Sequence, residues 1–506
     1  MHEKSNASKA ASTQLYDLIF LSLLMILATA ISAYFLLHQS IRLDESQSLW
    51  QSSRSLKGLI KTISQDVHMP LYSVLLHLWQ RLVGNSIETA RIPSLFFFLL
   101  SIPALYSLGK QAFQKNIARF ACLLFSLSPF ISWYGNETRM YSLLTLLTIL
   151  NQISFLKLIS SLQNNQNHRI LWAYFSLTTI LGIYTHYFFW LVLTTQFFYL
   201  LLTHKNLLKK YFNTFILMLG IILCSFVPWV LQVLKVGFFS NTTPLINLPT
   251  YLNLFNSFTQ FIFGFQAEKI NTIILSLWPI TVLMLFFYLQ KNNRLDKNAL
   301  YFLLTAFLPP LLIFLISITI RPIFVTRYFI FTVPSLFLFL SWLIYAYSKT
   351  VSYLLKTTFV SAMICTLYLQ NVLPNAPIKE NYRAAASYLS SQSSNQDLIA
   401  ISAPFTIYPI EYYYQGPAKL VTIPSWNRYE IGPVPEFSLE NLNSESKNFE
   451  KVYQKVWLVL SYDQGEEAEI KKYFDEKYHK VDELVISNGL RLYAYKLRYD
   501  PPVSIQ

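Results

Sequence analysis

Residues 42–50 read Arg-Leu-Asp-Glu-Ser-Gln-Ser-Leu-Trp, and residues 66–72 read Asp-Val-His-Met-Pro-Leu-Tyr. Both follow the first long apolar run, Leu15 to Leu37, which at about 23 residues is long enough to cross a bilayer. Asp44 and Glu45 are therefore expected at the membrane surface, where a carboxylate can meet a substrate carried in the lipid. Because adjacent carboxylates repel each other and bind protons more readily, the pair indicates a site that holds a base or a cation. The alternative interpretation is a solvated turn at the interface.

The composition indicates a membrane protein. Of 506 residues, 53% are hydrophobic and only 13% are charged, which is more apolar surface than one soluble core can bury. The net charge of +14 is interpreted by position, because basic residues mark the cytoplasmic side of membrane proteins. No nucleic-acid partner is predicted. The three cysteines each lie in apolar runs, so no disulfide framework is indicated.

The fold class predicted is a membrane all-α protein with about 11 transmembrane helices, interfacial amphipathic helices in the first outer loop, and a C-terminal soluble α/β domain. Lys4 and Lys9 precede the first span and place the N-terminus in the cytoplasm. The apolar faces at 56–63 and 70–82 are too short to cross, so both are assigned to the membrane surface. The spans are predicted at residues 15–37, 92–112, 118–133, 141–161, 170–202 (two spans meeting at His186), 212–236, 271–290, 299–320, 329–347 and 351–371.

Polar and charged residues gather on the outer side of this predicted topology, at the ends of several spans. A charge deep in the membrane costs about 2.5–3.5 kcal/mol on insertion scales, but one at a helix end is tolerated. Each residue alone therefore has a structural explanation, and His186 in particular is as readily structural as functional. Together they indicate a polar cavity.

The polar and charged residues at the outer ends of the spans suit a lipid-anchored donor with a phosphate head group. Arg321 and Arg327, with Tyr328, are the predicted phosphate-binding residues, because a guanidinium matches phosphate oxygens in a two-pronged contact. Asp44, with Glu45 beside it, is predicted as the catalytic base that removes a proton from an acceptor hydroxyl. A phosphate leaving group needs no acid, so cations suffice to stabilise it. The residues predicted to line the sugar or acceptor site are His68, Glu137, Arg139, Tyr141, His186 and Tyr187.

The predicted domains are a transmembrane domain at 1–371 and an extracytoplasmic α/β domain at 372–506. Apolar runs shorten after about Pro374, and glutamates and lysines intermingle. Helices are predicted at 381–391, 438–454 and 465–478, strands at 397–402, 420–423 and 456–461, and a closing hairpin at 484–497 with Asn488-Gly489 in its turn. This domain shows no phosphate loop, metal cluster or nucleophile motif, and it is predicted to cap or support the membrane part.

A family resemblance is carried by motifs in a fixed order. They are Asp44-Glu45, Asp66-Val-His-Met-Pro-Leu-Tyr72 before His77-Leu-Trp79, Ala90-Arg-Ile-Pro-Ser94, Trp133-Tyr-Gly-Asn-Glu-Thr-Arg-Met-Tyr-Ser142, Tyr184-Thr-His-Tyr187 and Arg327-Tyr328. Over residues 15–345 the chain resembles the GT-C integral-membrane glycosyltransferases of the family 39 type, relatives of protein mannosyltransferases and lipid A aminoarabinose transferases. The resemblance implies a polyprenyl-phosphate-linked sugar donor, an inverting transfer on the outer face, and Asp44 as base. Met69-Pro70 departs from the two prolines that relatives often carry.

Other functions stay open at this point. A lipid-linked sugar flippase or transporter would also carry charges among many spans, although such proteins often show internal repeats. A non-catalytic glycan-assembly subunit would need the arginines but not Asp44, and within the enzyme class a lipid-pyrophosphate donor is the second choice. No cofactor is assigned; Asp44 and Glu45 are a candidate site for a divalent cation, without a further ligand of recognisable spacing. The acceptor is a protein, a lipid or a polysaccharide, and the predicted location is the plasma (inner) membrane.

Overall fold

The computed structural model describes residues 2–66, 68–166, 168–236, 246–276, 278–292, 295–373, 377, 379–430 and 434–497. The described chain forms two compact units. The first contains residues 2–37, 68–236 and 246–373, and the second contains residues 38–66 together with the C-terminal residues 379–497. The segment that carries Asp44 thus belongs to the same unit as the C-terminal domain, although in sequence it lies between two parts of the first unit.

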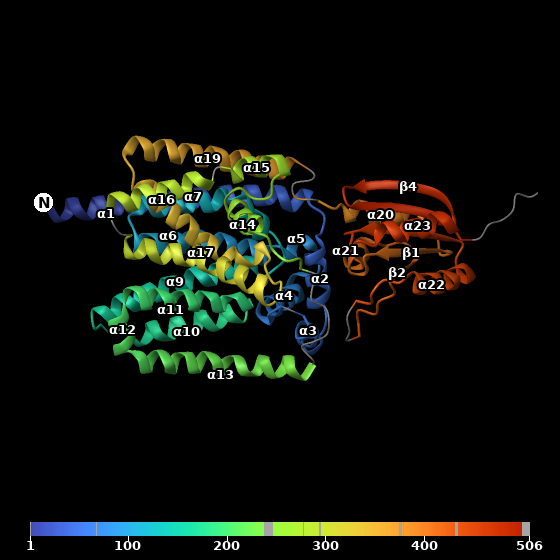
Figure 1. Cartoon of the computed structure of the whole chain (residues 1–506), viewed down its shortest axis with the longest axis horizontal. Coiled ribbons are helices and arrows are strands. Elements are labelled where there is room, and N and C mark those ends of the chain that lie inside the picture. Colours follow the sequence, from blue (N-terminus) through green and yellow to red (C-terminus); the bar gives the residue numbers. More distant parts are fainter. Residues whose placement is uncertain are drawn as a thin grey trace, which may run out of the picture. The chain divides into compact units, whose positions relative to one another are not determined.

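The first unit is helical (Figure 1). Its helices are α1 (His2–His38), α4 (Pro70–Val83), α5 (Ile87–Ala90), α6 (Ile92–Ala112), α7 (Lys115–Leu127), α8 (Pro129–Gly135), α9 (Tyr141–Gln163), α10 (Arg169–Ile183), η1 (Tyr187–Phe189), α11 (Trp190–Thr203), α12 (Lys205–Lys210), α13 (Phe212–Val236), α14 (Tyr251–Phe263), α15 (Glu268–Leu275), α16 (Trp278–Asn292), α17 (Lys297–Thr319), η2 (Thr326–Thr332), α18 (Val333–Tyr345) and α19 (Lys349–Val372).

Many of these helices can cross a membrane. Among the described residues, 8 helices are long and apolar enough, or up to 9 if the bent pair α7 and α8 is one span. Two shorter apolar helices, Arg169–Ile183 and Tyr187–Thr203, lie where the fifth and sixth spans were predicted. The chain is therefore an integral multi-pass membrane protein, and these elements occupy all the predicted span positions.

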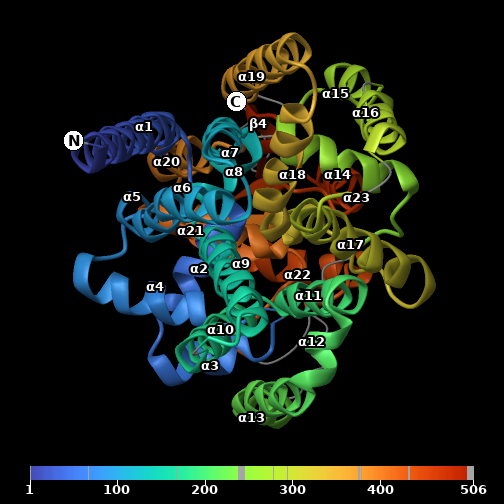
Figure 2. The ribbon, with the colours of Figure 1, turned by 90° about the vertical axis from the view of Figure 1, so that its left-hand side faces the viewer.

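Helix α9 lies at the centre of the first unit, with 83% of its apolar window buried. It contacts α6 on one side and α10 on the other, and the view along the helices shows this arrangement (Figure 2). Polar side chains join these neighbours inside the apolar core: Asn151 of α9 donates a hydrogen bond to Thr179 of α10 at 2.9 Å, and Gln196 of α11 donates one to Asn151 at 2.8 Å. Such bonds between helices help to hold a membrane bundle together.

The third predicted span differs from the structure, because it is not one straight helix. The chain bends by 63° between α7 and α8. Proline disfavours the helical conformation in the residue before it, and Ser128, which precedes Pro129, is extended with ψ 119°. The Ser128 hydroxyl then accepts a hydrogen bond from the Ile131 N–H at 3.2 Å and starts the second helix.

Close packing at α10 gives a prediction about stability. A Cβ added to Gly182 would overlap with the ring of the buried Phe189. We expect Gly182→Ala to destabilise the protein by about 1–3 kcal/mol through overpacking. Gly220, in α13, has no atom within 4 Å of the same point, so Gly220→Ala should be neutral or stabilise by up to about 1 kcal/mol. Thermal unfolding in detergent measures both, and equal midpoints would contradict the prediction.

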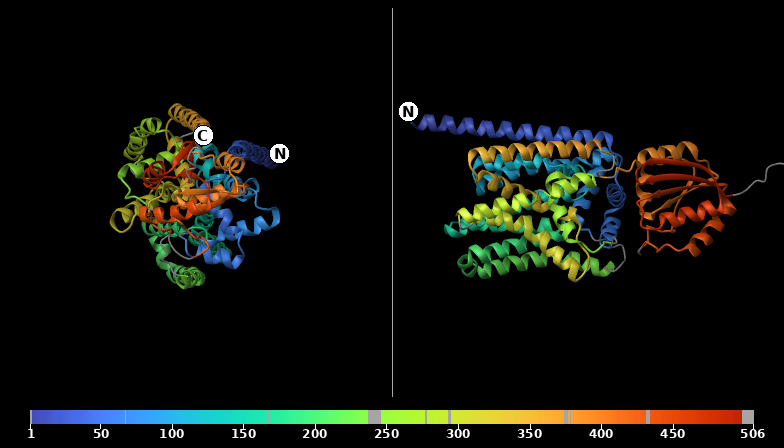
Figure 3. Two further views of the ribbon diagram at one scale, coloured as in Figure 1. Left: turned by 90° about the vertical axis from the view of Figure 1, so that its right-hand side faces the viewer. Right: turned by 45° about the horizontal axis from the view of Figure 1, so that its top comes forward.

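The second unit has α-helices on both faces of one sheet, as the right-hand view of Figure 3 shows. Its elements are α2 (Leu43–Ser52), α3 (Leu56–Ile63), α20 (Tyr382–Gln392), β1 (Asp397–Ser402), η3 (Pro404–Thr406), α21 (Ile407–Tyr413), β2 (Lys419–Thr422), α22 (Leu439–Val452), β3 (Lys455–Ser461), α23 (Glu467–Lys477), β4 (His479–Ser487) and β5 (Leu490–Lys496). The strand order is β2-β1-β3-β5-β4, in which β1 is parallel to β2 and β3 and the remaining pairs are antiparallel.

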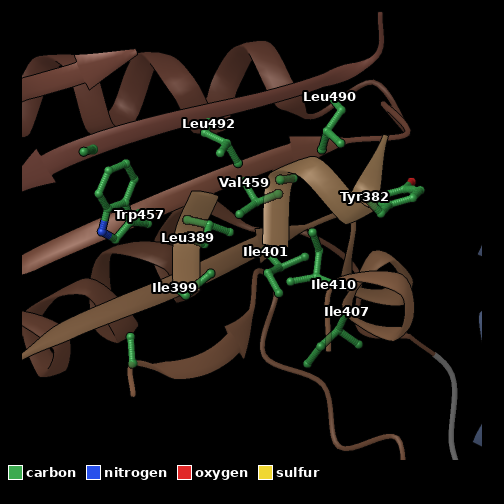
Figure 4. Packing of buried hydrophobic residues seen from close by; sticks show 13 residues of the cluster. Tyr382, Leu389, Ile399, Ile401, Ile407, Ile410, Trp457, Val459, Leu490 and Leu492 are labelled. Atoms are coloured by element: carbon green, nitrogen blue, oxygen red, sulfur yellow. The ribbon is translucent and has the colours of Figure 1, made fainter. Parts of the chain in front are cut away.

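The central strands β1 and β3 are buried on both faces, as their continuous apolar runs predict. Ile399 and Ile401 of β1 face a core shared with α20 and α21, and Figure 4 shows this packing around Trp457 and Leu389. Leu398 and Ala400, at the alternate positions, face the core shared with α22 and α23. The predicted α/β domain is confirmed, and the hairpin turns at Gly489, whose φ is 75°.

Five α-helices were not predicted from the sequence: α2, α5, α12, α14 and α21. The region of α2 was interpreted as a loop or turn, whereas both predicted surface helices, α3 and α4, are present. Acidic residues in the first turn, Asp44 and Glu45, are a signal for a helix start that could have located α2.

Candidate active site

Arg139 and His68 meet within the first unit. Nη2 of Arg139 lies 2.6 Å from Nε2 of His68. A guanidinium only donates hydrogen bonds, so Nε2 of His68 accepts and the ring carries its proton on Nδ1. The contact joins the segment before α4 to the segment between α8 and α9, and it brings together two residues that the sequence predicted for one site.

The segment that carries Arg139 is buried and fixed. Arg139 is 5% exposed. Its carbonyl accepts a hydrogen bond from the Ser94 hydroxyl at 3.3 Å, and that hydroxyl also lies 2.7 Å from the Tyr72 hydroxyl. Helices α4 and α6 therefore both position the Arg139 backbone. A guanidinium in this position can donate charge-assisted hydrogen bonds to an anionic ligand.

His186 and Tyr328 form a second contact in the same unit. Their ring centroids are 5.1 Å apart, and the Arg327 guanidinium lies 5.7 Å from the Tyr328 ring centre. Nδ1 of His186 accepts a hydrogen bond from the Phe188 N–H at 3.0 Å. Burial lowers the pKa of His186 to about 3, and the neighbouring His68 and Arg139 act in the same direction. His186 is thus neutral and lies within electrostatic reach of the first contact.

We call these five residues, His68, Arg139, His186, Arg327 and Tyr328, the cationic cluster. They come from four separate segments of the first unit, and all five were predicted from the sequence. Two positive guanidinium groups and two histidine rings here can bind an anionic head group and stabilise negative charge that forms on it.

Aromatic and acidic residues predicted for the site lie in the same segments. Tyr141 is fully buried, with its ring 5.0 Å from that of Tyr134. Glu137 is 4% exposed and lies in the buried segment that carries Arg139. The Tyr187 hydroxyl accepts a hydrogen bond from Nε1 of Trp229 at 3.2 Å. Tyr187 is therefore held in place by α13.

Arg321 is placed differently from the cationic cluster. It is exposed just after α17, and its backbone N–H donates to the Ile316 carbonyl at 3.2 Å. Among the described residues, no contact joins its side chain to Arg327. The predicted pairing of Arg321 with Arg327 in one phosphate clamp stays a prediction.

Asp44 and Glu45 lie in the first turn of α2, in the second unit, and their environments differ. Glu45 is fully buried, and its Oε2 accepts a hydrogen bond from the Arg42 N–H at 3.0 Å. This bond satisfies one of the free N–H groups at the helix start. Asp44, the neighbouring residue, is half-buried. Glu45 thus has a structural task, and Asp44 is the carboxylate better suited to exchange a proton.

Asp44 and Glu45 are also the residues predicted as a candidate cation site. Among the residues that it describes, no three histidine, cysteine, aspartate or glutamate side chains lie close enough together to hold a metal ion. Within the described part of the chain, Asp44 and Glu45 therefore have no third ligand of these types.

The lowered pKa of His186 predicts how stability depends on pH. The unfolded chain binds a proton on this histidine at about pH 6.5, whereas the folded protein resists protonation down to about pH 3. The folded state therefore loses stability as the pH falls below 6.5, by about 2 kcal/mol between pH 7.5 and 5.0. We expect His186→Asn to lose less stability over this range. Unfolding midpoints in detergent at the two pH values test this, and an equal loss in both proteins would contradict it.

Part of the chain matches a known protein family, and the fold is similar to solved structures. Residues 67–231 match the dolichyl-phosphate-mannose-protein mannosyltransferase family. The fold is similar to that of ArnT from Cupriavidus metallidurans in the apo state, with a TM-score of 0.63, 11% identity, and coverage of 96% of this chain and 98% of that one. ArnT from the same organism bound to undecaprenyl phosphate gives a TM-score of 0.59, 10% identity and the same coverage.

The fold is also similar to that of an oligosaccharyltransferase. The oligosaccharyltransferase of Archaeoglobus fulgidus, tethered to an acceptor peptide, gives a TM-score of 0.50 and 12% identity over 96% of this chain and 75% of that one. No match was found among curated protein sequences.

Proposed function

We propose that this chain, whose fold is similar to that of ArnT and of which residues 67–231 match the dolichyl-phosphate-mannose-protein mannosyltransferase family, is a glycosyltransferase that moves a sugar from a polyprenyl-phosphate donor to an acceptor hydroxyl. The observation that carries the proposal is the cationic cluster, in which the Arg139–His68 contact and the Arg327–Tyr328 pair lie within one neighbourhood of a multi-pass membrane unit. A phosphate carried on a lipid is negatively charged and is held at the membrane, so it is a suitable ligand for the arginines of a membrane unit. The ArnT structure that contains undecaprenyl phosphate supports the same ligand class.

The proposed reaction is a single displacement. The acceptor oxygen attacks the anomeric carbon and forms the new C–O bond, while the bond from that carbon to the phosphate oxygen breaks and its electron pair leaves with the phosphate. Asp44 takes the proton of the acceptor hydroxyl. Arg139 and Arg327 stabilise the negative charge on the departing phosphate. The anomeric configuration inverts, because the attack comes from the face opposite the leaving group.

The side of the membrane is part of the proposal. Lys4 and Lys9, before the first apolar run, and the lysines between spans favour a cytoplasmic N-terminus, which would put residues 38–66 and the C-terminal domain on the outer side. The reaction would then take place on the outer, periplasmic face of the inner membrane. Arg321, exposed after α17, would meet the donor phosphate as it approaches.

The test is a transfer assay with purified protein in lipid vesicles. A panel of radiolabelled polyprenyl-phosphate sugars is offered with crude cell-envelope acceptor, and the product's anomeric configuration is determined by NMR. We expect one donor to be consumed and its configuration to invert. Movement of the intact lipid-linked sugar across the bilayer without bond cleavage would favour a flippase. Donor binding without either process would favour a glycan-assembly subunit, and turnover only with pyrophosphate-linked donors would exclude the monophosphate donor class.

A further inference from the structure

Helix α2 cannot hold Asp44 in place without outside support. It has only 10 residues, and helices shorter than about 12–15 residues are marginal in water even with favourable sequences. A catalytic base, in contrast, has to stay close to a productive geometry, since a displacement of about 1 Å can cost about 100-fold in rate. The contacts that fix α2 within the second unit therefore matter for chemistry as well as for folding.

The chain just before α2 is held by the C-terminal domain. The Ile41 N–H donates a hydrogen bond to the Tyr413 hydroxyl at 3.0 Å. The Arg383 N–H donates one to the Ser40 hydroxyl at 3.2 Å, and the Arg383 guanidinium lies 5.3 Å from the Tyr413 ring centre. Arg383 lies in α20 and Tyr413 in α21. Two helices that pack on the sheet therefore hold the segment that leads into α2.

The far end of α2 is held by a second group of contacts. The Trp50 ring lies 5.1 Å from that of Tyr408 and 5.6 Å from that of Tyr429. The Arg428 guanidinium lies 5.5 Å from the Trp50 ring centre and 5.2 Å from that of Tyr408. Arg428 also pairs with Glu411 at 2.5 Å, and its side chain is only 6% exposed. Cation–π contacts of this kind strengthen when they are shielded from water.

We infer that the C-terminal α/β domain positions α2, the helix that carries Asp44, by holding it at both ends. We call these contacts the clamp. Tyr413, Trp50 and Arg428 are its positioning residues for Asp44. This inference rests on the proposed function, in which Asp44 is the base. It assigns the domain a part in the reaction, because its helices α20 and α21 and the loop carrying Arg428 hold a segment that the chain supplies between α1 and α4. Tyr413, Trp50 and Arg428 need not contact the substrate, because they affect the reaction only through the position of α2.

A matched pair of double variants tests the clamp. Tyr413→Phe with Arg428→Gln removes the hydroxyl that holds Ile41 and the cation over Trp50. Tyr388→Phe with Lys471→Gln is the control in the same domain: Tyr388 donates to Asp482 at 2.7 Å, and Lys471 pairs with Asp475 at 2.5 Å and lies 5.2 Å from the Tyr493 ring centre. Each double variant thus loses one hydrogen bond made by a tyrosine hydroxyl and one cation that both forms an ion pair and lies near an aromatic ring.

Two readouts are needed, and the first is independent of activity. Hydrogen exchange should rise at least about tenfold at the amides of residues 43–52 in the clamp variant and stay unchanged in β1, whereas the control variant should leave residues 43–52 as in the wild type. The second readout is sugar transfer, in which the clamp variant should lose about 100-fold in kcat with little change in the KM for the lipid-linked donor. The control variant should keep its kcat.

The outcomes separate this inference from the function on which it rests. Unchanged exchange at residues 43–52 would overturn the clamp. Faster exchange with normal kcat, in a protein that Asp44→Asn inactivates, would overturn the positioning role and leave the proposed function intact. Full activity of Asp44→Asn would remove Asp44 from its proposed role as base, and the positioning role with it, whatever the exchange data show.

Discussion

Replacing Asp44 by asparagine should reduce sugar transfer by about 10²–10⁴-fold while the donor still binds. Asparagine has nearly the same shape as aspartate but cannot accept the acceptor's proton at neutral pH. The loss should appear in kcat, because the donor phosphate is proposed to bind to the cationic cluster of the first unit and not to Asp44. The measurement is initial-rate transfer with a radiolabelled polyprenyl-phosphate sugar, alongside equilibrium binding of the same donor.

Two control variants make this result specific. Glu440 lies in the first turn of α22, as Asp44 does in α2, so Glu440→Gln removes a comparable charge from a helix start in the same unit. It should leave transfer unchanged. Glu45→Gln keeps a carbonyl oxygen that can accept from the Arg42 N–H, so it should retain most of the activity. Wild-type rates in Asp44→Asn, or a larger loss in Glu45→Gln, would remove Asp44 from its proposed role.

Arg139→Lys should lower transfer by about 10²–10³-fold and should also weaken donor binding. Lysine keeps the positive charge, but it loses the planar fork that contacts His68 Nε2 and that is proposed to bind a phosphate oxygen at the same time. Initial rates and donor affinity in detergent measure the two effects. His68→Gln, which keeps an acceptor for the guanidinium, should be milder than His68→Leu, and the double variant Arg139→Lys with His68→Leu should lose less than the sum of the two single losses.

Arg119→Lys is the matched control for this prediction. Arg119 pairs with Asp17 at 2.5 Å in the same unit, so the substitution perturbs an arginine ion pair outside the cationic cluster. It should leave donor binding unchanged even if it lowers the unfolding temperature. Weakened donor binding in both variants would show that the effect at Arg139 reflects general destabilisation of the unit.

The sequence predicted most of the elements because their signals are local. Runs of apolar residues long enough to span a bilayer located the membrane helices, and α3 and α4 followed from short amphipathic patterns. In the C-terminal domain, β1 was predicted with the bounds that the structure shows, and the Asn488-Gly489 turn located the hairpin. The bend at Pro129 was missed, since a proline inside an apolar run can either kink a span or lie within a continuous one, as Pro309 does in α17.

The sequence by itself determined that this is a multi-pass membrane protein with a C-terminal α/β domain, and it selected Asp44, His68, Arg139, His186, Arg327 and Tyr328 as site residues. Only the tertiary structure decided which of them meet. Arg139 and His68 are 71 positions apart, and Ile41 and Tyr413 are 372 apart. Local propensity and apolar period depend on neighbours in sequence, whereas these contacts depend on how separate helices pack and on where each side chain points. For this reason the separate tasks of Asp44 and Glu45, adjacent in sequence, and the clamp on α2 emerged only from the folded chain.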